Sequence, residues 1–221
     1  EDFFEVPGEV EVKPEKSGFT DFGKITEIPL EYMTLRQSAK TCGISISEGK
    51  LHIQGGNSLA SKYNQGLLAR RHQHHSYDFT AKMEFTPGDY CHMAGIVCYY
   101  NYDNNYYLHM SVDDEGKTYV MLNVSVNKEI TQSEKVYLQE NGKPAYLKAE
   151  VRECDVTFFV SQDGISYTQV GDVLDMRNLS DERVDGNGFT GAMVGVSCQD
   201  LHGDGVQADF DWLDYKVFKP L

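Results

Sequence analysis

The sequence predicts an all-β protein in which two antiparallel sheets stack as a sandwich. Apolar and polar residues alternate with a period of two in many short segments, and turn residues separate these segments at regular intervals. Helical spacing of apolar residues is confined to a turn or two within residues 176–183. Parallel sheets would need crossover helices, so the strands are expected to pair antiparallel. No repeat of propeller-blade length is present, which argues against a propeller.

The first residues read as a connection rather than as part of the sandwich. Residues 1–17 are acidic, contain two prolines and have few large apolar residues after Phe4. We therefore expect residues 1–18 to be a linker or lead-in segment and residues 19–221 to form a single sandwich domain. Within this domain, residues 50–54 form a short strand that Gly55, Gly56 and Asn57 close.

The clearest strands lie between residues 79 and 112. From Phe79 to Phe85 the apolar residues alternate strictly with Thr80, Lys82 and Glu84, which places one set on each face of a sheet. Pro87-Gly88-Asp89 ends this strand. Residues 94–100 and 106–112 then form an antiparallel hairpin around the polar turn 101–105.

Later strands follow from the same alternation. We expect them at 120–126, 145–151, 156–160, 167–170 and 208–215. The hairpin between the third and the fourth turns at Asp163-Gly164. In the last strand Ala208, Phe210 and Trp212 alternate with acids, so Trp212 is expected in the core.

Composition excludes some classes of partner. The chain has 221 residues, a net charge of −14 and a pI near 4.8. Nucleic acids and anionic membranes demand clustered basic side chains, so neither is expected as a partner, whereas a neutral sugar is compatible. No apolar run approaches the roughly twenty residues that span a bilayer, and no membrane segment is expected.

Five cysteines without a close-set pair favour buried free thiols. They are Cys42, Cys91, Cys98, Cys154 and Cys198. Exported domains usually pair their cysteines, so the pattern favours a reducing compartment and a cytoplasmic location. A large core needs no disulfides wherever it lies, so a periplasmic or secreted location stays open.

The basic cluster at residues 70–75 offers one candidate metal site. On a strand, His72 and His74 would project from one face and offer two imidazoles to a transition metal, as in a cupin-like metal-dependent enzyme. His92, His109 and His202 are the other histidines that such a site would draw on, but nothing in their spacing selects them. A solvated strand face is the simpler interpretation, with Arg70 and Arg71 paired to acids at an interface or sheet rim.

Acidic residues near the last strand offer another candidate. Asp209 and Asp211 share the outer face of the last expected strand, and Asp204 lies in the loop before it, which glycines make adaptable. Carboxylates placed in this way suit a structural calcium ion that ties the strand to the loop. The alternative is ordinary solvated acids in an acidic protein. No cofactor is expected to be required.

Tyrosines between residues 99 and 107 suggest sugar stacking. Tyr100, Tyr102 and Tyr107 are the candidates, because an aromatic face receives the apolar side of a pyranose. Alternation divides these tyrosines between the two faces of a sheet, so part of the group is expected in the core.

Four segments together carry a family resemblance. They are EYMTLRQ (31–37), KLHIQGGNSLAS (50–61), QGLLARRHQHHSYDFTAKMEFTP with MAGIVCYYN (65–87 and 93–101), and FTGAMVGVSCQD with ADFDWLDY (189–200 and 208–215). In order and spacing they resemble the C-terminal β-sandwich domain of family 43 glycoside hydrolases, the β-xylosidases and α-L-arabinofuranosidases. The resemblance implies a concanavalin A-like jelly roll.

The resemblance also implies a division of labour. In this family the catalytic carboxylates sit in a five-bladed propeller, so the chain is expected to carry no catalytic residue and to have a catalytic propeller as its partner. A loop of the sandwich helps to close the sugar pocket, and Phe189 is the candidate residue of that loop. The implied substrates are xylo-oligosaccharides or arabinosyl sugars, and the domain is also a candidate for homo-oligomer contacts. The alternatives are a free-standing carbohydrate-binding module and the cupin-like enzyme.

Overall fold

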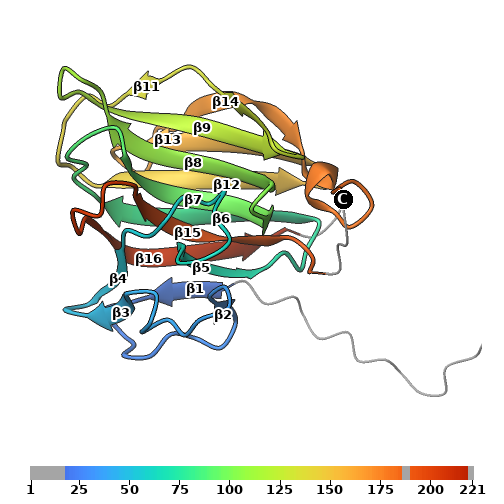
Figure 1. Ribbon diagram of the computed structural model, residues 1–221, viewed down its shortest axis with the longest axis horizontal. Coiled ribbons are helices and arrows are strands. Elements are labelled where there is room, and N and C mark those ends of the chain that lie inside the picture. The colour runs from blue at the N-terminus through green and yellow to red at the C-terminus, as the bar shows by residue number, and fades with distance from the viewer. Residues whose placement is uncertain (1–17, 186–189, 219–221) are drawn as a thin grey trace, which may run out of the picture.

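Two antiparallel sheets form a sandwich (Figure 1). The computed structural model describes residues 18–185 and 190–218. Sheet A contains, in spatial order, β14 (Thr168–Asp175), β13 (Asp155–Ser161), β12 (Ala145–Arg152), β6 (Ser76–Glu84), β16 (Gln207–Val217), β4 (Lys50–Gln54) and β3 (Ile44–Ser47), with β1 (Gly18–Asp21) also paired to β16. The all-β two-sheet prediction is therefore confirmed.

Sheet B stacks on sheet A. Its order is β10 (Glu129–Gln132), β9 (Thr118–Val126), β8 (Asn104–Val112), β7 (His92–Asn101), β15 (Met193–Asp200), β5 (Gly66–Arg71) and β2 (Tyr32–Met33), and β11 (Val136–Tyr137) pairs with β9. The hairpin between β7 and β8 is tighter than expected, because Asn101 pairs with Asn104 and leaves two residues in the turn. The expected helical turn is the 3-10 helix η1 (Met176–Leu179). No helix in the described ranges could cross a lipid bilayer.

The main core fills the space between the sheets. In β6 the inward side chains Tyr77, Phe79, Ala81 and Met83 are fully buried, and the intervening residues are half-buried. This is the alternation that the sequence predicts, and burying each large side chain contributes roughly 1.5–3 kcal/mol to folding.

A second, smaller core lies on the outer face of sheet B. It contains Leu59, Leu67, Ala69, Val97, Tyr99, Tyr107 and Met193, with Leu35 and Met93 packed against it. Residues before β5 therefore cover part of this face. Every residue of β8 is buried as a result, and β7 and β15 are buried along almost their whole length. These strands position the loops at both ends of β15.

Trp212 is not in the core, contrary to the prediction. The pairing of β16 with β6 shifts between Phe210 and Trp212, where two residues of β16 oppose one step of β6. This β-bulge turns Trp212 to the outer face of sheet A, where its ring lies 5.6 Å from Phe19 and 6.1 Å from Tyr146. Strict alternation cannot foresee a bulge, because one extra residue reverses every later side chain.

The cysteines are free thiols, as predicted, but most are not buried. Cys98 and Cys198 are buried, Cys42 and Cys91 are half-buried, and Cys154 is exposed. Burial raises the pKa of Cys98 and of Cys198 to about 12. Only these two fit the expected description.

Candidate functional site

The loop between η1 and β15 is the predicted pocket loop. Its candidate residue, Phe189, lies outside the described residues. Hydrogen bonds hold the described residues of the loop on both of its sides. On one side the side chain of Asn127 donates to the Arg183 carbonyl (3.2 Å) and accepts from the Asp185 N–H (3.0 Å). On the other side the His72 N–H donates to the Ala192 carbonyl (3.0 Å).

Asp175 fastens the start of this loop. Its carboxylate accepts hydrogen bonds from the Arg177 N–H (2.9 Å), the Arg177 guanidinium and the Arg183 guanidinium (3.0 Å). The Arg177 side chain is the main reason that the pKa of Asp175 falls to about 2. The loop therefore starts from a fixed, charged anchor.

A hollow of about 330 Å³ adjoins the described part of the loop. Its lining comes from four segments: His72 and His75, Glu153 and Cys154, residues 176–182 except Asn178, and Gly191 and Ala192. The hollow has both apolar walls and titratable side chains. Its lining includes residues from both described flanks of the predicted pocket loop.

The three tyrosines predicted to stack on a sugar differ in how exposed their rings are. Tyr100 and Tyr107 are 4% and 1% exposed, and their hydroxyls donate to Asp181 and to the Ser197 carbonyl. Neither ring offers a free face to a sugar. Tyr102 is half-buried, and the ammonium group of Lys62 lies 5.3 Å from its ring centre. Of the three candidates, only Tyr102 keeps substantial exposure.

His72 and His74 do not form the expected pair on a strand. Strand β5 ends at Arg71, so both histidines lie in the following loop. Each ring contacts a different tyrosine: His72 Nδ1 lies 3.1 Å from the Tyr77 hydroxyl, and His74 Nδ1 lies 3.1 Å from the Tyr215 hydroxyl. Burial, with a smaller contribution from neighbouring histidines, lowers the pKa of His72 to about 4.

Arg70 also departs from its expected role. It is 6% exposed, and within the described residues it has no carboxylate within 4.0 Å. Its guanidinium lies over the Tyr215 ring at 4.1 Å and donates to Gln73 Oε1 at 3.2 Å. Aromatic packing replaces the expected acid pairing here.

The three calcium candidates have separate partners. Asp209 contacts His52 Nδ1 (2.7 Å), and Asp211 pairs with Lys82 (2.5 Å) and Lys50 (3.7 Å). Asp204 instead lies 3.5 Å from His92 Nε2. The structure thus places Asp204 among a different set of residues, and calcium binding stays a prediction.

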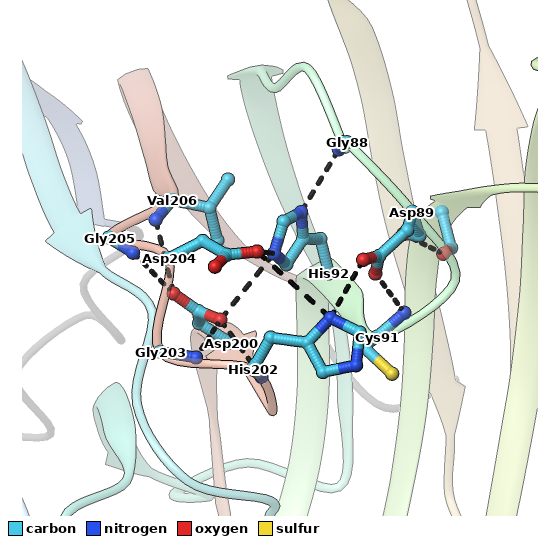
Figure 2. A network of polar contacts seen from close by, with 11 residues as sticks. Gly88, Asp89, Cys91, His92, Asp200, His202, Gly203, Asp204, Gly205 and Val206 are labelled. Carbon is cyan, nitrogen blue, oxygen red and sulfur yellow. Dashed lines mark hydrogen bonds and ion pairs between the residues drawn. The ribbon is translucent and has the colours of Figure 1, made fainter.

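A network of polar contacts joins two loops at the other end of β15 (Figure 2). Antiparallel pairing of β15 with β7 places Asp200 opposite His92. The loop before β7 adds Asp89 and Cys91, and the loop after β15 adds His202 and Asp204. The Asp200 side chain is 1% exposed, and it accepts from the backbone N–H groups of His202, Gly203, Gly205 and Val206 at 2.7–3.2 Å.

Sequence reasoning named His92 and His202 as possible further ligands of a site at His72 and His74, and Asp204 as a calcium candidate, but it did not join the three. Residues 89–92 and 200–204 lie far apart in the chain, and only the pairing of β7 with β15 brings them together. The available signal was Asp200 at the end of a buried strand, followed by Gly203 and Gly205, which are typical of a loop wrapped around a carboxylate.

Comparison with known proteins identifies the family. The model of the beta xylosidase C-terminal concanavalin A-like domain matches residues 20–216. A putative beta-xylosidase of Escherichia coli (strain K12) is 33% identical over 172 residues, covering 76% of this chain and 32% of the relative. A beta-xylosidase of Bacillus subtilis (strain 168) is 29% identical over 208 residues, covering 92% of this chain and 38% of the relative.

Solved structures agree in fold. The crystal structure of xylan beta-1,4-xylosidase from Bacillus halodurans C-125 superposes with a TM-score of 0.87 at 29% identity, over 98% of this chain and 41% of that chain. The chain thus spans between 32% and 41% of the length of these relatives. It belongs to the C-terminal concanavalin A-like domains of family 43 β-xylosidases.

Proposed function

We propose that this sandwich is the accessory domain of a β-xylosidase-type glycoside hydrolase, in which it packs on a catalytic five-bladed propeller and borders its sugar pocket. The observation that carries the proposal is the match of residues 20–216 to a C-terminal domain that makes up less than half of each relative compared above. The expected substrates are xylo-oligosaccharides or arabinosyl sugars. The chain alone is expected to hydrolyse neither.

Anchoring of the pocket loop supports this role. Hydrogen bonds fix the chain as far as Asp185 on one side and from Gly191 on the other, where the carbonyl of Gly191 accepts from Arg71 at 3.4 Å. The described residues on both flanks of the loop are therefore held in place. Such a loop can shape a pocket that another domain supplies.

Exposed apolar side chains supply candidates for the domain interface. Leu30 is 99% exposed, Tyr63 is 63% exposed and Met33 is 38% exposed, and all three lie in the segment between β1 and β5. Large apolar side chains in water favour association with a partner. We assign them to contact with the propeller rather than with a second copy of this chain.

The test is a domain exchange with a related enzyme. The C-terminal domain of the Bacillus halodurans xylosidase would be replaced by residues 18–221 of this chain, and release of 4-nitrophenol from 4-nitrophenyl β-xyloside measured. The exchanged enzyme is expected to be more active than the same enzyme truncated before its sandwich. A folded exchange protein without this gain would contradict the proposal, as would hydrolysis by this chain alone.

Within the exchanged enzyme, Phe189→Ala tests the pocket loop. A lower kcat/KM with an unchanged melting temperature is expected, and Tyr137→Ala, a half-exposed aromatic on the edge strand β11, is the matched control. Calorimetric titration of the isolated chain with xylohexaose tests the carbohydrate-binding alternative. Binding there, together with no effect of Phe189→Ala, would favour a free-standing binding module.

The cellular compartment of the protein is also part of the proposal. Five free thiols are expected to persist in a reducing compartment, and we propose the cytoplasm. Fractionation of the source cells with an antibody against this chain would test it, and recovery of the protein outside the cytoplasm would contradict it.

A further inference from the structure

Three carboxylates gather at one end of β15 without a permanent cation. Asp89, Asp200 and Asp204 come from the two loops that meet there (Figure 2). Among the described residues, every ion pair within 4.0 Å of these carboxylates involves a histidine and none involves lysine or arginine. Histidine is not a permanent cation, so among the described residues no fixed positive charge balances the three carboxylates, and the cluster attracts a cation.

Asp200 shapes the loop rather than offering a ligand. Burial would raise its pKa, but backbone N–H groups of the loop outweigh burial and lower it to about 2. Each of its two oxygens already accepts two of these N–H groups. The loop wrapped around Asp200 carries His202 and Asp204 toward Asp89, whose Oδ2 lies 2.8 Å from His202 Nδ1.

His92 supplies independent support for a ligand at this place. Its Nδ1 accepts the Gly88 N–H at 3.0 Å, so the ring proton lies on Nε2. His92 is 5% exposed, and its Nε2 points between Asp200 and Asp204 at 3.5 Å from each, without a hydrogen-bond partner in the described part of the chain. An unmade hydrogen bond at a buried donor costs about 1–3 kcal/mol. A carboxylate held as a metal ligand commonly accepts such a bond.

We propose that Asp89, Cys91, His202 and Asp204 bind a Zn²⁺ ion, with the Nε2–H of His92 donating to the Asp204 carboxylate. One ligand atom each from Asp89, Cys91 and His202 already lies within 4.8 Å of the others, and the same holds for Asp89, His92 and Asp204. Tetrahedral zinc brings its ligand atoms to roughly 3.3–3.8 Å from one another, because its bonds are about 2.0–2.3 Å long. The side chains of His202 and Asp204 are about half or more exposed, so they can turn to close this gap.

The ligand types select the metal. A thiolate and an imidazole beside two carboxylates favour zinc, whereas calcium takes oxygen ligands alone. Binding replaces the thiol proton of Cys91 with the metal, and that proton passes to solvent, so affinity rises with pH. His202 would bind through Nδ1 and keep its proton on Nε2. Four protein ligands leave no open position, and the ion would be a structural clasp between the two loops.

The inference does not depend on the proposed enzyme partner. After treatment with EDTA and removal of the chelator, the chain would be titrated with Co²⁺ as a spectroscopic substitute and then with Zn²⁺. One equivalent of Co²⁺ is expected to give the visible bands of tetrahedral cobalt and a thiolate-to-metal charge-transfer band. Zn²⁺ is expected to displace the cobalt and to raise the melting temperature.

Variants locate the site. Cys91→Ser is expected to abolish the charge-transfer band, and His202→Ala to weaken zinc binding at least as much as the roughly 10- to 100-fold that loss of a supporting residue costs. Cys154→Ser and His75→Ala are matched controls, since both residues are exposed and line the hollow that adjoins the predicted pocket loop, away from this cluster. Circular dichroism checks that each variant folds.

Three outcomes would overturn the proposal. They are a charge-transfer band that survives Cys91→Ser, zinc affinity that the control variants lower as much as His202→Ala does, and stabilisation by Ca²⁺ but not by Zn²⁺.

Discussion

Asp200 stays charged although its side chain is buried. Four backbone N–H groups point at its two oxygens, and they hold the folded-state pKa near 2 against an ordinary value of 3.8. Because the folded pKa is depressed, this carboxylate stabilises the fold above the unfolded pKa, and the contribution is lost as pH falls through the folded pKa. The difference corresponds to about 2 kcal/mol.

Asp200→Asn is therefore expected to lower the free energy of unfolding by about 2 kcal/mol at pH 7. Urea denaturation at pH 7, 5, 4 and 3 measures it. The difference in free energy of unfolding between the wild-type chain and the variant should be constant from pH 7 to 5 and decrease below pH 4. Asp172→Asn on β14 serves as a control with little change, because among the described residues no basic side chain lies within 4.0 Å of the Asp172 carboxylate. A difference that increases toward pH 3 would contradict this account.

Trp212 is the only tryptophan and reports on the bulge of β16. Since the ring is half-buried on the outer face of sheet A, its fluorescence is expected at longer wavelength than that of a core tryptophan and should be quenched by acrylamide. Trp212→Phe should cost less than the roughly 3–5 kcal/mol typical of truncating a core aromatic. An emission that resists acrylamide would place the ring in the core instead.

At the scale of elements, the alternation of apolar and polar residues predicted the strands that have one face in the core and the other toward solvent. β6, β12 and β13 are of this kind. Alternation gave no signal for β2 and β11, which have two residues each, or for β10, whose residues are all exposed. The spacing of apolar residues within a strand shows which side chains face the core, but it does not show which distant strand is the pairing partner.

Gly95 in β7 and Gly195 in β15 lie where strands approach too closely for a side chain. A Cβ on Gly95 would overlap the Leu108 carbonyl oxygen and lie 2.9 Å from His109 Cα. A Cβ on Gly195 would overlap the Leu68 carbonyl oxygen and the Cα of Ala69. Backbone atoms of buried strands cannot move aside cheaply.

Gly95→Ala is expected to destabilise the fold by more than about 3 kcal/mol, measured by urea denaturation. Gly116→Ala is the control, because its Cβ would meet no atom within 4 Å and only its φ of +77° is unfavourable. The control substitution should cost about 1–2 kcal/mol, the usual cost of a left-handed backbone for a residue with a Cβ. Equal losses for the two variants would mean that packing between the strands is not the cause.

For the whole molecule, the fold and family followed from local patterns, while the polar cluster did not. The four motif segments predicted the sandwich and its relatives. The cluster needs two loops that lie more than a hundred residues apart in the chain, and the order of strands in sheet B alone makes them neighbours. Burial of Tyr107, one of the three tyrosine candidates, has the same kind of cause, since Leu35 and Leu59, distant in the chain, pack with it on the outer face of sheet B.

Thiol reactivity tests the global packing. In the folded chain, Ellman's reagent should react quickly with Cys154, more slowly with Cys42 and Cys91, and not with Cys98 or Cys198, whose pKa values burial raises to about 12. All five should react in denaturant. Rapid reaction of the two buried thiols under native conditions would show that the sheets open readily.

The pairing of β1 with β16 sets how the domain responds to tension. The strands are antiparallel, with Gly18 opposite Tyr215 and Asp21 opposite Trp212. The N-terminal end of β1 therefore lies beside the C-terminal end of β16. A pull through these ends loads the hydrogen bonds one after another, like a zipper, rather than all together. Pulled in this way, the first strand would peel away under a small force, while the rest of sheet A, joined through β6 and β12, stayed closed.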